Sequence, residues 1–294
     1  MNIALLGLAI SCLSVPALLV RLARAPNEAI GFWRLTTVVI LLAPLAWGRR
    51  GSWAALPAFD RKSTFGAGLL FFIHLWTFVY SAQHTTIAHC MIAFSTHPLW
   101  TGLGARLFFG EAITGRLLRA YALAALGVWA LFSGSHTGGG AGLLGDAAGL
   151  LSALSFSGYV LAGKGARRKL DNSVFAFLCS LVMAACFLAV GAARGIPMTG
   201  YPGVFWAAVA GLAVITSLGG HALFTHLLAV MDVNLLSCAK LLEIPLSALG
   251  AWLIFGEELS GRTLASFALV SAAVLVLMIP SPGAPRADPA ELEE

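Results

Sequence analysis

Two charged residues, three positions apart, interrupt an otherwise apolar stretch in the last quarter of the sequence. Lys240 and Glu243 stand within "LLSCAKLLEIPLSAL", and residues three apart share one face of a helix. As an internal ion pair they would neutralise each other and fix helix packing. As a binding site, Lys240 would attract a carboxylate, while Glu243 would hold an ammonium group or a proton. Because burial disfavours the charged forms, either residue could titrate.

Other apolar stretches also carry polar and aromatic side chains. Histidine can hydrogen-bond a substrate or exchange a proton near neutral pH, and an aromatic ring can hold an apolar group or a cation. Each such residue has an alternative role in packing or in a hydrogen bond between helices. Glu243 and His97 are the candidates for proton coupling. The candidates for substrate contact, besides Lys240 and Glu243, are His74, His97, Trp100, Tyr159, Thr216, Ser217 and His221.

The composition indicates that membrane-spanning helices position these residues. The chain is 59% hydrophobic and 11% charged, whereas a soluble domain is about a quarter charged. A helix crosses a bilayer with about 20 apolar residues, and the apolar runs are too long and too uniform for barrel strands. The sequence therefore predicts an all-α polytopic membrane protein with ten transmembrane helices. Their ranges are 3–22, 29–47, 65–83, 86–109, 117–133, 147–164, 173–193, 203–226, 234–255 and 262–279.

Two prolines fall near the middle of the fourth and ninth predicted spans. Pro98 and Pro245 each remove a helix hydrogen bond and can kink the helix. Their matched places suit two gates that open in turn, although a kink that serves packing alone is the other interpretation. We expect spans one to four and six to nine to line a central midplane cavity, and spans five and ten to support packing.

The basic residues orient the predicted bundle. Of the 18 lysines and arginines, twelve lie on the side that holds both termini, four lie on the opposite side and two lie within spans. This asymmetry predicts cytoplasmic N- and C-termini by the positive-inside rule. The net charge of +5 therefore does not indicate nucleic-acid binding, since no basic stripe with interleaved aromatics remains.

The sequence contains one of its turns twice. "ARLFFGEAITGRLL" (105–118) and "AWLIFGEELSGRTL" (251–264) are identical at eight of fourteen positions and lie 146 residues apart. With five spans in each half, the second half must enter the membrane from the opposite side, which predicts inverted repeats, a feature of transporters. Thr114 and Ser260 are expected to cap the helices that follow. Glu111 and Glu257 are expected to make capping or arginine contacts.

With these motifs, the sequence resembles the drug/metabolite transporter superfamily, in its EamA-like branch. The resemblance covers residues 1–280. It rests on ten helices in duplicated halves, on the midspan prolines, and on "FFGEAITG", "IFGEELSG", "FWRLTTVVILL" and "GDAAGLLSALSFSGYVLAGK". Since that group includes amino-acid exporters, the resemblance implies export of an amino acid or a related amphipathic compound.

The leading interpretation is a secondary transporter in the inner (plasma) membrane that works by alternating access. Uptake or efflux of organic cations or drugs is the alternative, and a scaffold, a channel or an intramembrane enzyme is less favoured. The expected partners are a small-molecule substrate, membrane lipids, and a proton or exchange substrate. We expect no enzyme activity, cofactor, metal or nucleic acid, and the fold requires no oligomer. The expected divisions are a first repeat at 1–134, a second at 135–279 with a glycine-rich link over 134–145, and a disordered cytoplasmic tail at 280–294.

Overall fold

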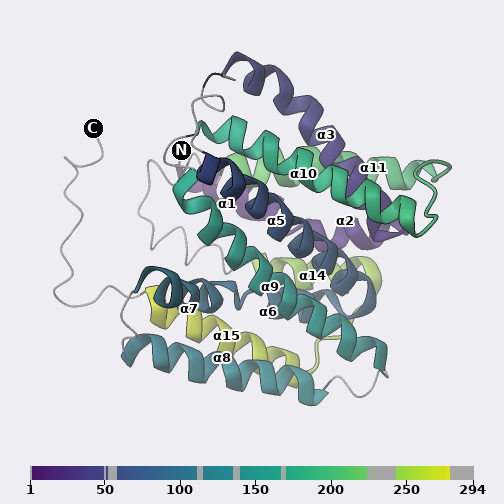
Figure 1. Ribbon diagram of the computed structural model, residues 1–294. Coiled ribbons are helices and arrows are strands. Elements are labelled where there is room, and N and C mark those ends of the chain that lie inside the picture. The colour runs from purple at the N-terminus through teal and green to yellow at the C-terminus, as the bar shows by residue number, and fades with distance from the viewer. Residues whose placement is uncertain are drawn as a thin grey trace.

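The computed structural model describes residues 2–49, 51, 58–110, 115–134, 140–166, 170–223, 227 and 243–278. The described residues form helices and turns and contain no strand (Figure 1), so the predicted all-helical class is confirmed for them. Lys240, Glu111, Thr114 and the C-terminal tail lie outside the described residues.

Helices in the first half of the chain fall on the first five predicted ranges. A break at residues 14–15 divides the first range, and a second break at residues 95–96 divides the fourth. The helices are α1 (Asn2–Leu13), α2 (Pro16–Ala23), α3 (Asn27–Gly48), α5 (Ala58–His84), α6 (Ile87–Phe94), α7 (His97–Phe109) and α8 (Gly115–Gly134).

The helices in the second half fall on the other five predicted ranges. The eighth range begins as an α-helix and continues as a π-helix, η2. Residues 140–145 belong to a helix, so the prediction of a glycine-rich link over 134–145 is wrong for that part. The helices are α9 (Gly140–Ala166), α10 (Asn172–Ala193), α11 (Gly203–Gly211), η2 (Leu212–Ala222), α14 (Glu243–Phe255) and α15 (Gly261–Met278).

Two of the interrupted helices have prolines just after the break. Pro16 and Pro98 lie in the first turns of α2 and α7, where a residue without an N–H costs no helix hydrogen bond. A neighbouring helix supplies a donor at each break. The Ser247 hydroxyl donates to the Ser14 carbonyl at 2.7 Å, and the Ser157 hydroxyl donates to the His97 carbonyl at 2.7 Å. These bonds satisfy backbone acceptors near the middle of the bundle.

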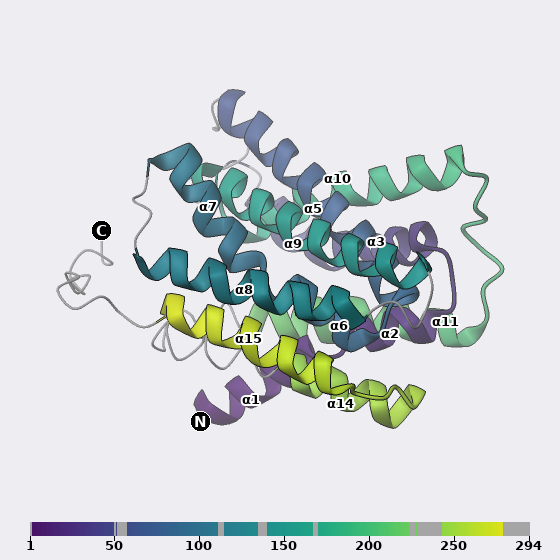
Figure 2. The ribbon, with the colours of Figure 1, turned by 90° about the horizontal axis from the view of Figure 1, so that it is seen from below.

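The helices pack in pairs that join the two halves of the chain. Helix α3 packs on α10, and α8 packs on α15. These two pairs lie on opposite sides of the bundle, with α3 and α10 at the top and α8 and α15 at the bottom of Figure 1; Figure 2, seen from below, has α8 and α15 in front. Between them, α5 packs on α9, α6 packs on α14, and α1 and α2 pack on η2 and α11. The centre of the bundle is therefore built from helices of both halves.

The outer surface of the bundle is strongly apolar. Phe108, Trp129 and Leu253 are 75%, 70% and 66% exposed, which would be unfavourable in water but not against lipid. Among the described residues, five helical segments are long and apolar enough to cross a bilayer: Ala4–Ala23, Asn27–Gly48, Asp60–His84, Gly142–Ala162 and Ser173–Ala193. Shorter apolar helices cover Leu118–Ala130, Gly203–Ser217 and Leu246–Phe255.

Candidate substrate cavity

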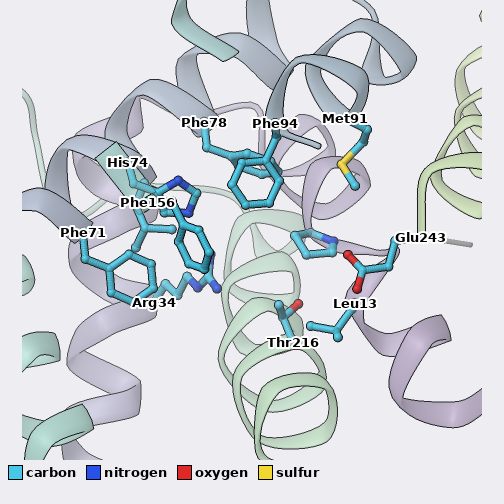
Figure 3. A pocket seen from close by; sticks show the side chains of 12 residues that line it. Leu13, Arg34, Phe71, His74, Phe78, Met91, Phe94, Phe156, Thr216 and Glu243 are labelled. Atoms are coloured by element: carbon cyan, nitrogen blue, oxygen red, sulfur yellow. The ribbon is translucent and has the colours of Figure 1, made fainter. Parts of the chain in front are cut away.

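A cavity of about 60 Å³ lies at the centre of the described helices (Figure 3). Both halves of the chain contribute to its wall, and α8 and α15 supply none of its described lining residues. Charged and polar groups face aromatic rings across it. The residues that line it are Leu13, Pro16, Arg34, Phe71, His74, Leu75, Phe78, Met91, Phe94, Phe156, Thr216 and Glu243.

Arg34 and Glu243 bring opposite charges to this cavity. They are only 8% and 7% exposed, and they extend toward it from different helices, α3 and α14 (Figure 3). Within the described part of the chain, no carboxylate oxygen lies within 4.0 Å of the Arg34 guanidinium. A buried cation is costly to retain without an anion, so the cavity is suited to a compound that carries negative charge.

Thr216 supplies a polar group between these two charges. The residue lies in η2 and is 1% exposed, and its side chain is seen between Arg34 and Glu243 in Figure 3. Its Oγ1 atom has no hydrogen-bond partner among the described residues. A buried hydroxyl without a partner is unfavourable, and a polar group in the cavity would relieve that cost. The position also fits the frequent occurrence of π-helical turns at functional sites.

Phenylalanine rings form the apolar wall of the cavity. Phe71, His74 and Phe78 lie on one face of α5, and Phe94 and Phe156 come from α6 and α9. The His74 ring centroid lies 5.1 Å from those of both Phe94 and Phe156 and 5.3 Å from that of Phe71. Rings at these separations pack favourably, which gives the cavity a firm aromatic side.

His74 is held in place by helix α9. Its Nδ1 atom lies 2.8 Å from the Ser152 hydroxyl oxygen and 3.1 Å from the Ser152 carbonyl oxygen. The side chain is 6% exposed. A hydrogen bond between helices was one of the two roles expected for His74, and the contact with Ser152 is such a bond. The ring also lines the cavity.

The other predicted substrate contacts with described side chains stand behind the cavity wall. The His97 ring contacts Phe94 and Phe156 with centroid separations of 5.2 and 5.1 Å. Tyr159 stacks on Phe71 at 4.3 Å. These residues support the aromatic wall from outside, because neither is among the described lining residues.

Trp100 bonds to the break that precedes its helix α7, and Ser217 bonds within its own helix η2. The Trp100 Nε1 atom donates to the Thr96 hydroxyl at 3.1 Å, and the Ser217 hydroxyl donates to the Leu212 carbonyl at 3.3 Å. Neither residue lines the cavity.

Three predicted residues have side chains outside the described part of the chain. The backbone of His221 lies in η2, and that of Pro245 lies in the first turn of α14, while Lys240 is not described at all. Pro98 is described. It follows the break between α6 and α7 and does not kink one continuous helix.

The duplicated turn ends two helices in the same way. Gly110 and Gly256 have φ angles of 71° and 67°, in the left-handed region that favours glycine. Their N–H groups donate to the carbonyls of Arg106 and Trp252 at 3.1 and 3.0 Å. Ser260 then caps α15, since the Thr263 N–H donates to its hydroxyl at 3.1 Å. The predicted cap at Ser260 is confirmed.

Glu257 joins four helices beside this turn. It forms an ion pair with Arg21 at the end of α2, and its Oε2 atom accepts from the Ile87 N–H at the start of α6 at 2.9 Å. The Arg21 guanidinium also donates to the carbonyls of Ala82 and Thr85, where α5 ends. We call this ion pair and its three backbone contacts the Arg21–Glu257 latch. The expected structural role of Glu257 is confirmed.

A second polar cluster lies next to the latch. Asp146 of α9 is fully buried and accepts from the Thr85 hydroxyl at 2.6 Å. The His89 Nδ1 atom lies 3.1 Å from Asp146 Oδ1, and its Nε2 atom lies 3.3 Å from the Thr263 hydroxyl. Thr85 belongs to both groups, so this end of the bundle is closed by one continuous set of polar contacts.

The sequence did not point to Arg34 or the phenylalanines as substrate contacts. The second predicted span begins at 29, which places Arg34 near a membrane interface, but α3 begins at Asn27 and Arg34 is about 10 Å along it. A sequence signal was present in α5, where Phe71, His74, Leu75 and Phe78 follow the spacing of one helix face.

A helical bundle with an apolar outer surface and a charged central cavity has the architecture of a multi-pass membrane transporter. Residues 143–279 match the model of the EamA-like transporter family, which confirms over this part of the chain the resemblance found from the sequence. A match to this family indicates a membrane transporter of the drug/metabolite type. Among curated proteins, no match was found.

Solved structures agree on the fold. One, titled "Crystal structure of protein", has a TM-score of 0.64 with 19% sequence identity. The alignment covers 94% of this chain and 96% of the other. At this identity the likeness concerns the fold alone, but it extends over the first half of the chain, which the family model does not reach.

Proposed function

We propose that the protein is a secondary transporter that exports an amino acid or a related amphipathic metabolite across the inner (plasma) membrane by alternating access. One observation carries this proposal: both halves of the chain line a single cavity that combines Arg34, Glu243 and a phenylalanine wall. A zwitterion with an apolar side chain presents complementary groups to all three. Such pockets, apolar with a few placed polar groups, are typical of small-molecule sites.

The pairing of the helices supports ten spans in two inverted repeats. In that scheme α3 and α10, α6 and α14, and α8 and α15 occupy equivalent places in the two halves, and each pair is in contact. The contact of α5 with α9 has its counterpart in the contact of η2 and α11 with α1 and α2. Exchange of the two halves therefore preserves the pattern of packing, as a pseudo-two-fold axis requires.

The charge asymmetry supports cytoplasmic termini. With that orientation the Arg21–Glu257 latch lies at the outer end of the bundle, so the described conformation is closed toward the outside. Alternating access then requires these contacts to break when the cavity opens outward. Glu243 and His97 remain the candidates for proton coupling.

Transport by the purified full-length protein in proteoliposomes tests the proposal. The panel contains amino acids, organic amines and cationic dyes, each measured with and without a pH gradient. We expect saturable flux or exchange of at least one amino acid, and a dependence on the gradient if protons are coupled. Flux of cations alone would favour the alternative of organic-cation or drug transport, and no flux across the panel would contradict the proposal.

Variants then separate chemistry from packing. We expect Glu243→Gln to abolish flux while the protein stays folded, and Glu258→Gln, an exposed control, to have no effect. Glu243→Gln and Lys240→Met should be made singly and together. If each single variant misfolds and the double variant recovers, the two residues form a structural pair.

A further inference from the structure

We infer that Arg34 binds an anionic group of the transported compound, a carboxylate in the first instance, and thereby selects substrates that carry one. This inference rests on the proposed transport function and extends it. It assigns to Arg34 the role of binding a carboxylate, which the sequence analysis had given to Lys240.

Three described arginines form ion pairs, and a comparison with them shows what is unusual about Arg34. Arg21 pairs with Glu257, Arg49 with Asp171, and Arg194 with Glu28. The side chains of these three arginines are 22%, 56% and 56% exposed, while Arg34 as a residue is 8% exposed. Thus the more deeply buried cation is the one that lacks a carboxylate within the described residues. Since burial without a counter-ion is unfavourable, the position is explained by a ligand that supplies the anion.

The geometry directs the Arg34 guanidinium into the cavity. Figure 3 shows the side chain passing beneath Phe156 and ending on the side that faces Thr216 and Glu243. A guanidinium presents a planar pair of donors that matches a carboxylate. The Thr216 hydroxyl, which has no partner among the described residues, is a further donor to the same anion.

The second charge in the cavity narrows the ligand class. Glu243 lines the same space and would repel a simple anion, but it would attract an ammonium group on the same molecule. The described charged and titratable groups of the cavity are Arg34, Glu243 and His74. A compound with a carboxylate and an ammonium group carries a charge opposite to that of Arg34 and one opposite to that of Glu243, and its apolar part can then pack on the phenylalanines.

Matched ligands test this assignment on the full-length protein. The probes are phenylalanine and leucine, each with its amide, its decarboxylated amine and its deaminated acid. Binding is measured by ligand-induced thermal stabilisation in detergent, and transport by competition in proteoliposomes. We expect the amino acids to bind at least about tenfold more tightly than their amides and amines, because the latter leave the buried cation unpaired.

Substitutions place the effect at Arg34. In Arg34→Gln the preference for amino acid over amide should fall below about threefold, and Arg34→Lys should retain part of it because the charge remains. Arg119→Gln removes an exposed arginine from α8, away from the cavity, and should keep the preference. If Arg34→Gln does not fold, Arg34→Lys decides: a preference weaker than that of the wild type supports the assignment, and an unchanged preference contradicts it.

The outcomes separate this inference from the proposed function. If the wild type binds or transports amides and amines as well as amino acids, the assignment of Arg34 is wrong while transport stands. The same holds if the wider panel yields a substrate without an anionic group, or if Arg34→Gln keeps the preference. If no compound in either panel is bound or transported, both are contradicted.

Discussion

Individual charged residues in this protein are stabilised by specific partners. Glu28 is 1% exposed and accepts from Arg194 at 2.5 Å and from the Trp76 indole at 3.4 Å. Asp146 is held by Thr85 and His89. Because an unpaired ion is expensive in a bundle surrounded by lipid, these contacts fix which helix ends lie together. The same rule makes Arg34 the residue whose surroundings most require a ligand.

Asp171 gives a pH-dependent prediction at the start of α10. Its pKa is lowered from 3.8 to about 2, first by a hydrogen bond from the Ser173 hydroxyl and then by one from Arg49. Because the folded pKa lies below the unfolded one, the stabilisation is present above about pH 4 and is lost as the pH falls toward 2. Asp171→Asn keeps a capping oxygen but loses the charge. We expect it to cost about 1 kcal/mol at pH 7, a value reduced by solvent screening.

Thermal unfolding of both proteins between pH 7 and pH 3 checks this prediction. The midpoint of Asp171→Asn should lie a few degrees below that of the wild type at pH 7 and should approach it at pH 3. Glu258→Gln, on an exposed carboxylate, should match the wild type throughout. A difference that stays constant with pH would mean that the charge of Asp171 contributes nothing.

At the scale of helices, glycines set how closely neighbours approach. A Cβ atom on Gly68 of α5 would lie 2.9 Å from the Val182 Cβ atom of α10, whereas one on Gly66, two residues earlier, would meet nothing within 4 Å. Small residues allow such close contact between membrane helices. Gly68→Ala should therefore destabilise the α5–α10 contact by about 1 to 3 kcal/mol. Gly66→Ala should be neutral or stabilise by up to about 1 kcal/mol through helix propensity.

The two variants form a matched pair, since they make the same change in the same helix. Their thermal stability in detergent, followed by the fraction that stays monodisperse after heating, gives the comparison. Equal thermal stability of Gly66→Ala and Gly68→Ala would show that the close contact of α5 with α10 at Gly68 does not contribute to stability.

Hydropathy predicted where the helices lie better than it predicted the breaks and the π-helical segment within them. Each of the ten predicted ranges contains a described helix, because about 20 apolar residues are a strong local signal. The breaks before Pro16 and Pro98 are less visible, since proline can either kink a helix or begin one. The π-helix η2 packs on α1 and α3, and contacts between distant segments are not contained in a local sequence pattern.

The cavity could be predicted only in part for the same reason. His74, Thr216 and Glu243 were chosen by depth along their spans, and the structure brings these three together. Trp100 and Tyr159 were chosen by chemistry at similar depth, yet they face elsewhere. The direction in which a residue points around its helix depends on tertiary packing, so depth alone could not separate these groups or reveal Arg34.

At the scale of the whole molecule, the latch and the cavity must be coupled if the protein alternates between two states. The latch joins α2, α5, α6 and the end of α14, and each of these helices also lines the cavity. A change that weakens the latch should therefore shift the population toward the outward-open state. Loss of about 1 kcal/mol would change that population about fivefold.

Labelling of a cysteine in the cavity measures this shift. The five native cysteines are replaced, Thr216→Cys is introduced, and a membrane-impermeant thiol reagent is added from the outside. With the latch intact the reagent reacts only when the cavity opens outward, which is rare, so labelling should be slow.

Glu257→Gln removes the charge that holds Arg21 and should speed labelling from the outside about fivefold, whereas Glu258→Gln, one residue away, should leave the rate unchanged. Reagent added from the inside should react at nearly the same rate with the Glu257→Gln variant, because a fivefold rise of a rare outward-open state removes only a small part of the inward-facing population. Equal outside rates for the two glutamate variants would mean that the latch closes no pathway to the cavity.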